Sequence, residues 1–365
     1  VVGKNSKLIS DGTNNINVNI DVKGTESIGL YAGENAKLEV KDHTVNANDG
    51  AVNYDADKNA TLTLKGTGTA HTGKKSLLFY LGENGTGKIS LGNTMNVTIE
   101  GGTTPAERGN AFYYVGNGTT FGATEISNWA KNNFGDGKTS TLGNLNLTMN
   151  AGSRLFIAQN TGMNLSDTTG VTISSATGAN IIGTDYKTFM LYLSKLTINQ
   201  DVDLNNTTDG YNHLEIANSS ITNAANKTMT GIQANDVAMA QENNKSLYAR
   251  NKVTLANEGN INLSGTTSTG IYAKFGELHN RATGVITIAN KSTAMYGIGD
   301  SLLENAGKIT VGTNSIAMYS EGSTTQAMKN TGTIELPQTD SVAMSYKPDS
   351  TLSSGTVLEN AGNYS

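Results

Sequence analysis

The chain has 365 residues and a formal net charge of −5, and it is 36% hydrophobic and only 16% charged. Its basic residues are scattered singly, which argues against a nucleic-acid partner, and no apolar run reaches the ~18–20 residues that insert across a membrane. The 42 glycines, the 3 prolines, the absence of cysteine and the abundance of Asn, Thr and Ser are typical of a β structure with many tight turns, not of a disordered chain.

A strand–turn–strand unit recurs through the N-terminal part of the chain. Each copy has an apolar strand that ends near Tyr31, Tyr54 or Tyr80, followed by a turn and a second strand. These tyrosines are 23 and 26 residues apart. Apolar and polar residues alternate within the strands, and successive side chains of a strand point to opposite faces. The pattern therefore predicts strands with one buried face.

The repeat is interrupted over residues 101–143, where we expect a loop and a short helix over 124–134. Thr124 is a candidate N-cap and Gly135 a stop signal. The apolar residues at helical spacing are Ile126, Trp129, Ala130 and Phe134. Insertions in repeat proteins often form the binding face. The alternative is that the helix only covers an exposed edge of the core, and the sequence leaves both interpretations open.

Weaker repeats fill the middle of the chain. Short strands are expected over 145–147, 171–173, 191–193 and 196–198. The polar stretch around Leu214 is expected to be coil with longer loops. Regular repeats begin again near Val237.

The C-terminal part, from Thr269 onward, repeats one pattern four times. Equivalent apolar positions are spaced by 24, 23 and 26 residues, and they are Ile271, Met295, Met318 and Met344. Such a period is typical of a solenoid, in which short strands bury their apolar faces only by stacking on neighbouring units. We predict an all-β, right-handed parallel β-helix with about 22–26 residues per coil. It is expected to be a single segment over 1–365 of a longer protein.

A tyrosine follows three of these apolar positions, at Tyr272, Tyr296 and Tyr319. The constant apolar set is expected to point inward and the tyrosines outward, beside small Gly or Ala neighbours. An internal tyrosine stack is the alternative, because aromatic residues suit either face of a strand.

One motif suggests an esterase, since residues 299–302 read Gly-Asp-Ser-Leu, the nucleophile block of GDSL esterases. However, Ser301 aligns with an ordinary turn of the neighbouring repeats, and no histidine follows His279 to act as its base. The sequence therefore predicts no catalytic serine.

Other catalytic and metal-binding patterns are weak. The four histidines are widely separated, so we expect no metal and no cofactor; they are His43, His71, His213 and His279. Two carboxylate pairs lie on one side of a strand, Asp55 with Asp57 and Asp201 with Asp203. Such pairs are usually solvated turn charges, but paired carboxylates are also what a glycosidase requires.

The units at 27–36 and 303–311 resemble the passenger domains of large monomeric (type Va) autotransporter adhesins of fusobacteria. The resemblance covers both ends of the chain well and the middle loosely. It implies type V secretion through the outer membrane, display on the bacterial cell surface, and a role in virulence. It also implies attachment to other bacteria, host glycans or host-cell receptors.

The sequence thus predicts a monomeric, non-enzymatic adhesin segment that binds through exposed faces and loops. The predicted partner-binding residues are the aromatic and arginine residues of the irregular region: Arg108, Tyr113, Tyr114, Trp129 and Phe134. Replacing Trp129 with Ala is expected to weaken binding and leave the fold intact. Two alternatives remain, a β-helical carbohydrate-active enzyme (lyase or glycosidase) and a purely structural stalk.

Overall fold

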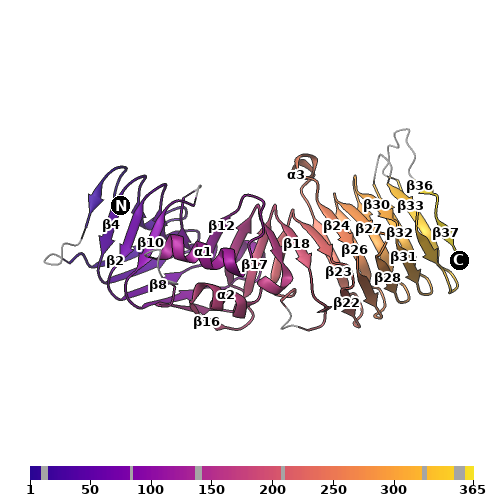
Figure 1. Cartoon of the computed structure of the whole chain (residues 1–365), viewed down its shortest axis with the longest axis horizontal. Coiled ribbons are helices and arrows are strands. Elements are labelled where there is room, and N and C mark those ends of the chain that lie inside the picture. The colour runs from indigo at the N-terminus through magenta and orange to yellow at the C-terminus, as the bar shows by residue number, and fades with distance from the viewer. Residues whose placement is uncertain (10–14, 83–84, 136–141, 207–209, 323–326, 349–357) are drawn as a thin grey trace. The chain divides into compact units, whose positions relative to one another are not determined.

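The computed structural model describes residues 1–365 apart from 10–14, 83–84, 136–141, 207–209, 323–326 and 349–357. The chain forms two compact units (Figure 1). Unit 1 comprises Val1–Thr161, Asp167–Met190 and His213–Glu215, and unit 2 comprises Gly162–Ser166, Leu191–Asn212 and Ile216–Ser365. The single segment over 1–365 stays a prediction.

Three parallel sheets, here named A, B and C, build unit 1. Sheet A contains β3 (Ile28–Ala32), β6 (Val52–Ala56), β9 (Leu77–Tyr80), β12 (Asn110–Val115), β14 (Arg154–Gln159), β17 (Lys187–Tyr192) and β20 (Leu214–Ala217). Sheet B contains β1 (Lys7–Leu8), β4 (Lys37–Val40), β7 (Thr61–Leu64) and β10 (Lys88–Leu91). Sheet C contains β2 (Val18–Val22), β5 (His43–Ala47), β8 (Gly68–Thr72), β11 (Met95–Ile99), β13 (Leu145–Met149) and β16 (Asn180–Gly183).

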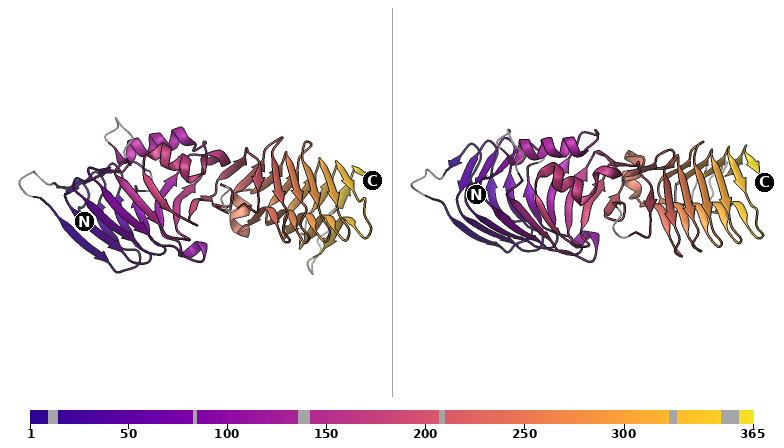
Figure 2. Two further views of the ribbon diagram at one scale, coloured as in Figure 1. Left: turned by 90° about the horizontal axis from the view of Figure 1, so that it is seen from below. Right: turned by 60° about the horizontal axis from the view of Figure 1, so that its bottom comes forward.

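Three further parallel sheets, here named D, E and F, build unit 2 (Figure 2). Sheet D contains β15 (Gly162–Asn164), β18 (Lys195–Ile198), β21 (Ser220–Asn223), β24 (Thr254–Asn257), β27 (Glu277–Asn280), β30 (Leu302–Asn305), β33 (Met328–Asn330) and β36 (Leu358–Asn360). Sheet E contains β19 (Val202–Asp203), β22 (Thr228–Gly231), β25 (Asn260–Leu263), β28 (Val285–Ile288), β31 (Lys308–Val311), β34 (Thr333–Glu335) and β37 (Asn363–Tyr364). Sheet F contains β23 (Val237–Glu242), β26 (Thr269–Lys274), β29 (Thr293–Ile298), β32 (Ile316–Glu321) and β35 (Val342–Lys347).

The predicted parallel β-helix is confirmed, because each strand pairs in parallel with its equivalent one coil away. In sheet F, Ile271 pairs with Met295, Met295 with Met318, and Met318 with Met344. The first three of these side chains are fully buried. A coil of unit 2 visits sheets D, E and F in turn, and it therefore has three strands.

The tyrosine column of unit 2 points outward. Tyr272 pairs with Tyr296 and Tyr296 with Tyr319, and all three side chains are half-buried. Their ring centroids are 5.4 and 5.1 Å apart. The expectation of an outward column is thus confirmed for unit 2.

In the equivalent column of unit 1, the three tyrosines that the sequence suggested as equivalent do not all occupy the same position. Tyr31 pairs with Asp55, and Asp55 pairs with Tyr80. Tyr54 instead pairs with Leu30 and Phe79 and is fully buried. The spacing of 23 and 26 residues between tyrosines was therefore misleading, because Tyr54 lies one position earlier in its coil and points inward.

A ladder of asparagines, buried except for the last one, Asn360, joins the coils of unit 2. The side-chain amide Nδ2 of each residue donates to Oδ1 of the next at 2.7–2.9 Å, in the order Asn223, Asn257, Asn280, Asn305, Asn330 and Asn360. Each of these residues ends a strand of sheet D, and an Asn-x-Gly turn begins at Asn257, Asn305, Asn330 and Asn360. The amides satisfy one another where the chain turns toward sheet E, and within the described chain only Oδ1 of Asn223, at the start of the ladder, is buried without a partner among them.

The helices lie in the coils that depart from the repeat. α1 (Ala123–Phe134) follows β12, where the preceding coil has β10 of sheet B. The predicted helix over 124–134 is confirmed, but its N-cap is Gly122 and not Thr124. The Gly122 N–H donates to the Glu125 carboxylate at 3.2 Å. The 3-10 helices are η1 (Pro105–Glu107) and η2 (Leu165–Asp167).

Two further helices correct the sequence analysis. Residues 171–173 are not a strand but lie within α2 (Gly170–Thr177). Thr169 Oγ1 accepts the Thr172 N–H at 3.2 Å, and Gly178 ends the helix in the left-handed conformation. α3 (Lys245–Arg250) was not predicted. Residues 214–217 form a strand, β20, where coil was expected.

Candidate functional site

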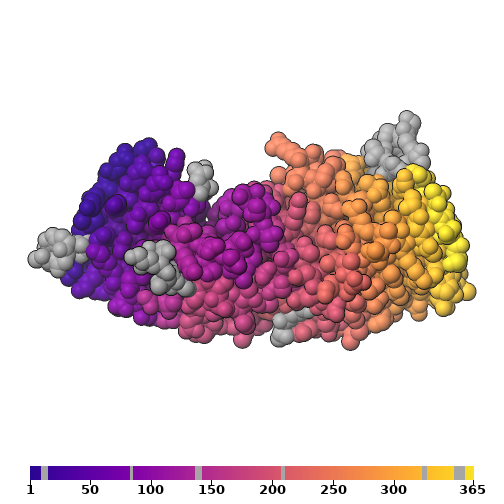
Figure 3. Space-filling view, viewed as in Figure 1, coloured from indigo at the N-terminus to yellow at the C-terminus, as the bar shows by residue number. Residues whose placement is uncertain are grey.

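An aromatic cluster fills the part of unit 1 where α1 replaces a strand. The inward column of sheet A is a stack of rings with centroids 4.8–5.8 Å apart: Tyr54, Phe79, Phe112, Phe156 and Phe189. Helix α1 adds Trp129 and Phe134 to this stack. α1 and α2 lie side by side along this side of unit 1 (Figures 1 and 2), and the space-filling view shows this purple-to-magenta region facing the viewer (Figure 3).

Trp129 lies at the centre of this cluster. Its ring centroid is 5.1 Å from Phe134, 5.3 Å from Phe156 and 5.5 Å from Phe112. Tyr114 and Phe121 meet it edge-on at 6.3 and 6.4 Å. This packing argues against the expectation that Trp129→Ala leaves the fold intact, because removing a ring packed against five others leaves a cavity that costs about 3–5 kcal/mol.

The outer edge of the cluster forms a small pocket. Its volume is about 110 Å³, and it is lined by Leu81, Gly82, Gly85, Tyr113, Tyr114, Val115 and Trp129. Three of the five predicted partner-binding residues, Tyr113, Tyr114 and Trp129, meet here. The structure thus brings together residues that are up to 16 positions apart in the sequence.

Local packing holds each aromatic residue of the pocket in place. The Tyr113 hydroxyl donates to Gln159 Oε1 at 2.5 Å. The Tyr114 ring stacks on Phe121 at 3.8 Å. Tyr114 takes the position where the next strand has Ala158, so a large ring stands beside a small side chain there. Burial, followed by the negative charge of Glu125, raises the pKa of the Tyr114 hydroxyl, which keeps it protonated and able to donate.

The other two predicted residues have structural positions. Phe134 is 1% exposed, so a partner cannot contact it directly, and that part of the prediction is corrected. Its ring anchors α1 to Phe79 and Phe112 at 5.2 and 5.7 Å. Arg108 is not in the pocket.

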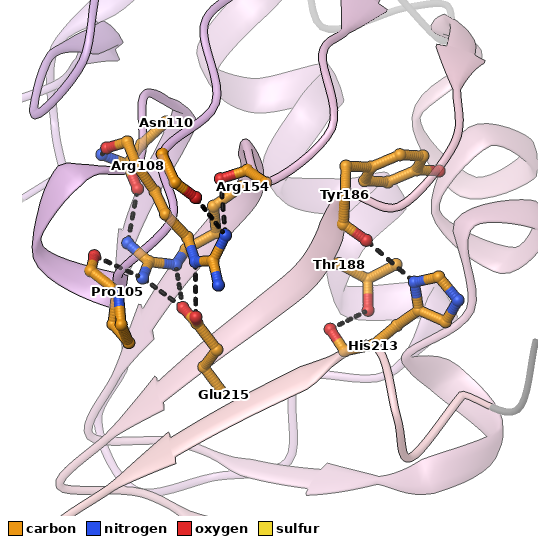
Figure 4. Close-up of polar contacts among 10 residues, drawn as sticks. Pro105, Arg108, Asn110, Arg154, Tyr186, Thr188, His213 and Glu215 are labelled. Carbon is orange, nitrogen blue, oxygen red and sulfur yellow. Dashed lines mark hydrogen bonds and ion pairs between the residues drawn. The ribbon is translucent and has the colours of Figure 1, made fainter. Parts of the chain in front are cut away.

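Arg108 belongs to a buried ion-pair network in unit 1 (Figure 4). Arg108 and Arg154 both donate to the carboxylate of Glu215, and their side chains are 10% and 3% exposed. Arg154 also donates to Asn110 Oδ1 at 2.7 Å, and Arg108 donates to the Gly152 carbonyl at 2.6 Å. Burial lowers the pKa of Arg154, and the Glu215 charge opposes that shift. The network fastens the loop before β12 to β20.

The groups that the sequence analysis weighed and disfavoured as catalytic make structural hydrogen bonds where the chain is described. Ser301 is buried; its hydroxyl donates to the Ile298 carbonyl at 2.8 Å and accepts the Gly276 N–H at 3.1 Å. Asp201 accepts the Thr228 N–H at 2.8 Å and Asp203 accepts the Asn205 N–H at 3.0 Å. These groups are occupied by turn hydrogen bonds.

The histidines are dispersed, as the sequence indicates. His213 Nδ1 donates to the Tyr186 carbonyl at 2.8 Å (Figure 4), and His71 pairs with Glu100 at 2.9 Å. Among the described residues, no group of three or more His, Asp or Glu side chains could hold a metal ion.

Asp55 is the one carboxylate of the sequence-predicted pairs with an unusual environment. Its side chain lies in the outer column of sheet A between Tyr31 and Tyr80, and it is only 6% exposed. Its Oδ1 atom is buried without a hydrogen-bond partner. Burial, and secondly the charge of Asp57, raises the pKa of Asp55 to about 7. Asp57 accepts a hydrogen bond from the Tyr31 hydroxyl at 3.3 Å.

Sequence reasoning missed several residues of the pocket. Gln159 fixes Tyr113 from the next coil, and Leu81 and Val115 supply the apolar lining. A correct count of positions within the coil would have found Gln159, because Val115 and Gln159 pair in neighbouring strands.

Comparisons with known proteins identify no relative of this chain. No family model matches it, and neither a curated protein nor a solved structure matches it. Within the described ranges, no helix has the length and apolar character needed to cross a membrane.

Proposed function

We propose that this chain is a non-enzymatic, monomeric segment of a bacterial surface adhesin, the passenger of a type Va autotransporter. It would act outside the outer membrane and attach the cell to host receptors, host glycans or other bacteria. The observation that carries the proposal is the aromatic pocket of Tyr113, Tyr114 and Trp129. Exposed aromatic side chains on a rigid support are typical of binding hot spots.

The parallel β-helix supports this proposal physically. Each outward column is fixed by the inward packing of the same strand, so an outward side chain loses little conformational freedom when it binds a partner. The repeats that resemble fusobacterial adhesins at 27–36 and 303–311 form strands of this coil.

A matched pair of substitutions tests the proposal. Val115 is 42% exposed at the pocket, and Val342 is 43% exposed on sheet F of unit 2. Beads coated with the full chain would be scored for attachment to host cells and to other bacteria. Val115→Arg should abolish attachment by blocking the pocket, whereas Val342→Arg should leave it unchanged. Attachment that survives Val115→Arg would overturn the assignment of binding to this pocket.

A carbohydrate-active enzyme is a second candidate because of Asp55. A carboxyl group with its pKa raised to about 7 is suited to act as a general acid beside the second carboxylate of Asp57. Turnover of a polysaccharide by the purified chain, lost in Asp55→Asn, would favour this candidate over the adhesin.

A structural stalk is favoured only for unit 2. Its asparagine ladder and apolar column repeat with little change from β24 to β33. Deleting two whole coils there should leave attachment intact if these coils serve only as support.

A further inference from the structure

The chemistry of the aromatic pocket narrows the class of ligand. Its described lining residues are aromatic, aliphatic or glycine, and none of them carries a charge. An anionic ligand would lose its hydration without gaining a countercharge from these residues. Glu125 also acts on Tyr114, which disfavours an anion further. The pocket is therefore suited to a neutral group.

Two residues that line the pocket, Tyr114 and Trp129, each carry a hydrogen-bond donor. Within the described chain, neither the Tyr114 hydroxyl nor the Trp129 indole N–H makes a hydrogen bond, in contrast to the Tyr113 hydroxyl, which is bound to Gln159. A purely apolar ligand, such as a leucine side chain of a partner protein, would bury these donors without a partner. That arrangement costs about 1–3 kcal/mol for each group, so the ligand should bring acceptor oxygens.

The size and shape of the pocket further restrict the class of ligand. Drug-sized ligands occupy about 300–1,000 Å³, whereas this pocket has a volume of about 110 Å³, which suits one small ring or part of it. The aromatic rings offer electron-rich faces that attract the positively polarised C–H groups of a ligand. A pyranose ring combines a face of C–H groups with neutral hydroxyl and acetamido oxygens.

We propose that the pocket of Tyr113, Tyr114 and Trp129 binds a neutral sugar residue of a cell-surface glycan. This inference rests on the proposed function and names the ligand class of the same site. The sugar stacks its C–H face on the aromatic rings, and its oxygens accept hydrogen bonds from Tyr114 and Trp129.

The chain contains its own reporter, because Trp129 is the single tryptophan. The full chain would be titrated with methyl galactoside, methyl mannoside and N-acetylglucosamine while Trp129 emission is recorded. Galacturonic acid and glucosamine serve as charged counterparts. At least one neutral sugar should give a saturable change in emission, and the charged sugars should give a weaker one or none.

Two hydroxyl deletions provide the specific test. Tyr114→Phe keeps the ring and removes one donor, so it should weaken sugar binding by about 3–10-fold. Tyr319→Phe removes a comparable outward hydroxyl in unit 2, where Tyr319 lies 3.5 Å from Glu321, and it should have no effect. Equal affinities of Tyr114→Phe and the unchanged chain would overturn the proposed geometry.

The outcomes separate this inference from the proposed function. If Val115→Arg abolishes attachment but no sugar changes Trp129 emission, or only charged sugars do, the adhesin survives and the neutral sugar is refuted. If a neutral sugar binds but Val115→Arg leaves attachment intact, the sugar pocket survives and its role in adhesion is refuted.

Discussion

The inward column of sheet A is built from rings, whereas the equivalent column of sheet F is built from methionine, isoleucine and small residues. In unit 1 the stack of Tyr54, Phe79 and Phe112 continues into the α1 residues Trp129 and Phe134. In unit 2 the column of Ile271, Met295 and Met318 packs in coils whose described residues form strands and turns and no helix. Aromatic rings fill the wider space that a helix leaves when it replaces a strand, since protein interiors are close-packed.

The two units also satisfy their buried polar groups differently. Unit 2 uses one ladder of identical asparagines, each bonded to the next. Unit 1 includes an ion-pair network between distant segments, in which Glu215 joins Arg108 and Arg154, besides isolated hydrogen bonds such as those from the buried Asn53 amide to the Val45 and His71 carbonyls. A regular repeat can share its stabilising contacts evenly, while an interrupted repeat depends on a few specific ones. The interruption is also where the pocket forms.

The largest expected effect concerns the ion-pair network of unit 1. Glu215→Ala should lower the free energy of unfolding by about 3–5 kcal/mol, because two buried arginines lose their shared carboxylate. Urea unfolding followed by Trp129 emission measures this. Glu304→Ala in unit 2 is the control; Glu304 pairs with His279 at 2.9 Å but is 41% exposed, so it should cost at most about 1 kcal/mol. Equal losses would remove this contrast between the units.

Breaking the asparagine ladder should have the next largest effect. Asn305→Ala leaves the Asn280 amide without its acceptor and Asn330 without its donor. We expect a loss of about 1–3 kcal/mol, measured by the urea midpoint in circular dichroism. Asn146→Ala in unit 1 removes an exposed bond to Asn96 and should change stability by no more than about 0.5 kcal/mol. A ladder variant as stable as this control would show that the shared amides contribute little.

A smaller effect is expected from pH, with opposite signs in the two tyrosine columns. The pKa of Asp55 is raised from 3.8 to about 7 by burial and by Asp57. Its contribution to stability is therefore fully present below pH ~3.8 and is lost as pH rises to about 7. In unit 2, hydrogen bonding to Lys347 lowers the pKa of Glu321, so that carboxylate stabilises the fold above its unfolded pKa and the contribution is lost at acidic pH.

Thermal melts of the unchanged chain and of Asp55→Asn between pH 4 and pH 7 test whether Asp55 makes the chain less stable as pH rises. The stability of the unchanged chain should fall relative to that of Asp55→Asn as pH rises through this window. The groups that face Asp55 are Tyr31, Tyr80 and Asp57. If the difference in melting temperature between the two chains does not change with pH, the pKa of Asp55 is not raised.

The smallest effect is expected in the tyrosine column of unit 2. Tyr296→Phe removes a long 3.4 Å contact to Glu321 and keeps the ring between Tyr272 and Tyr319. The melting temperature should change by less than that of Tyr113→Phe, which loses the 2.5 Å bond to Gln159 in unit 1. If Tyr296→Phe lowers the melting temperature more than Tyr113→Phe does, the outward hydroxyls of unit 2 contribute substantially to its stability.

The regular coils could be predicted from the sequence because one residue recurs at each position. The apolar column of Ile271, Met295 and Met318 fixes both the register of the strands in sheet F and the face of each strand that points inward. The same reasoning failed at Tyr54, where a tyrosine stands at an inward position and Asp55 takes the outward one. Residue type alone does not reveal a shift of one position, although such a shift turns a side chain to the opposite face.

The site could be predicted only in part. The clustering of Tyr113, Tyr114 and Trp129 followed from an aromatic-rich interruption of the repeat. The pairing of Arg108 with Glu215, 107 residues away in the sequence, could not be foreseen. Nor could α2 be foreseen, since its β-branched residues favour a strand and its helical form depends on the caps at Thr169 and Gly178.

The accessibility of Trp129 to a small neutral quencher tests the central claim most directly, namely that the aromatic core of unit 1 opens into a binding pocket. Acrylamide would be titrated against the full chain and against Val115→Arg. We predict blue-shifted emission, because five rings surround Trp129, with partial quenching that Val115→Arg reduces. Emission typical of a fully exposed indole, or quenching that Val115→Arg leaves unchanged, would contradict the account.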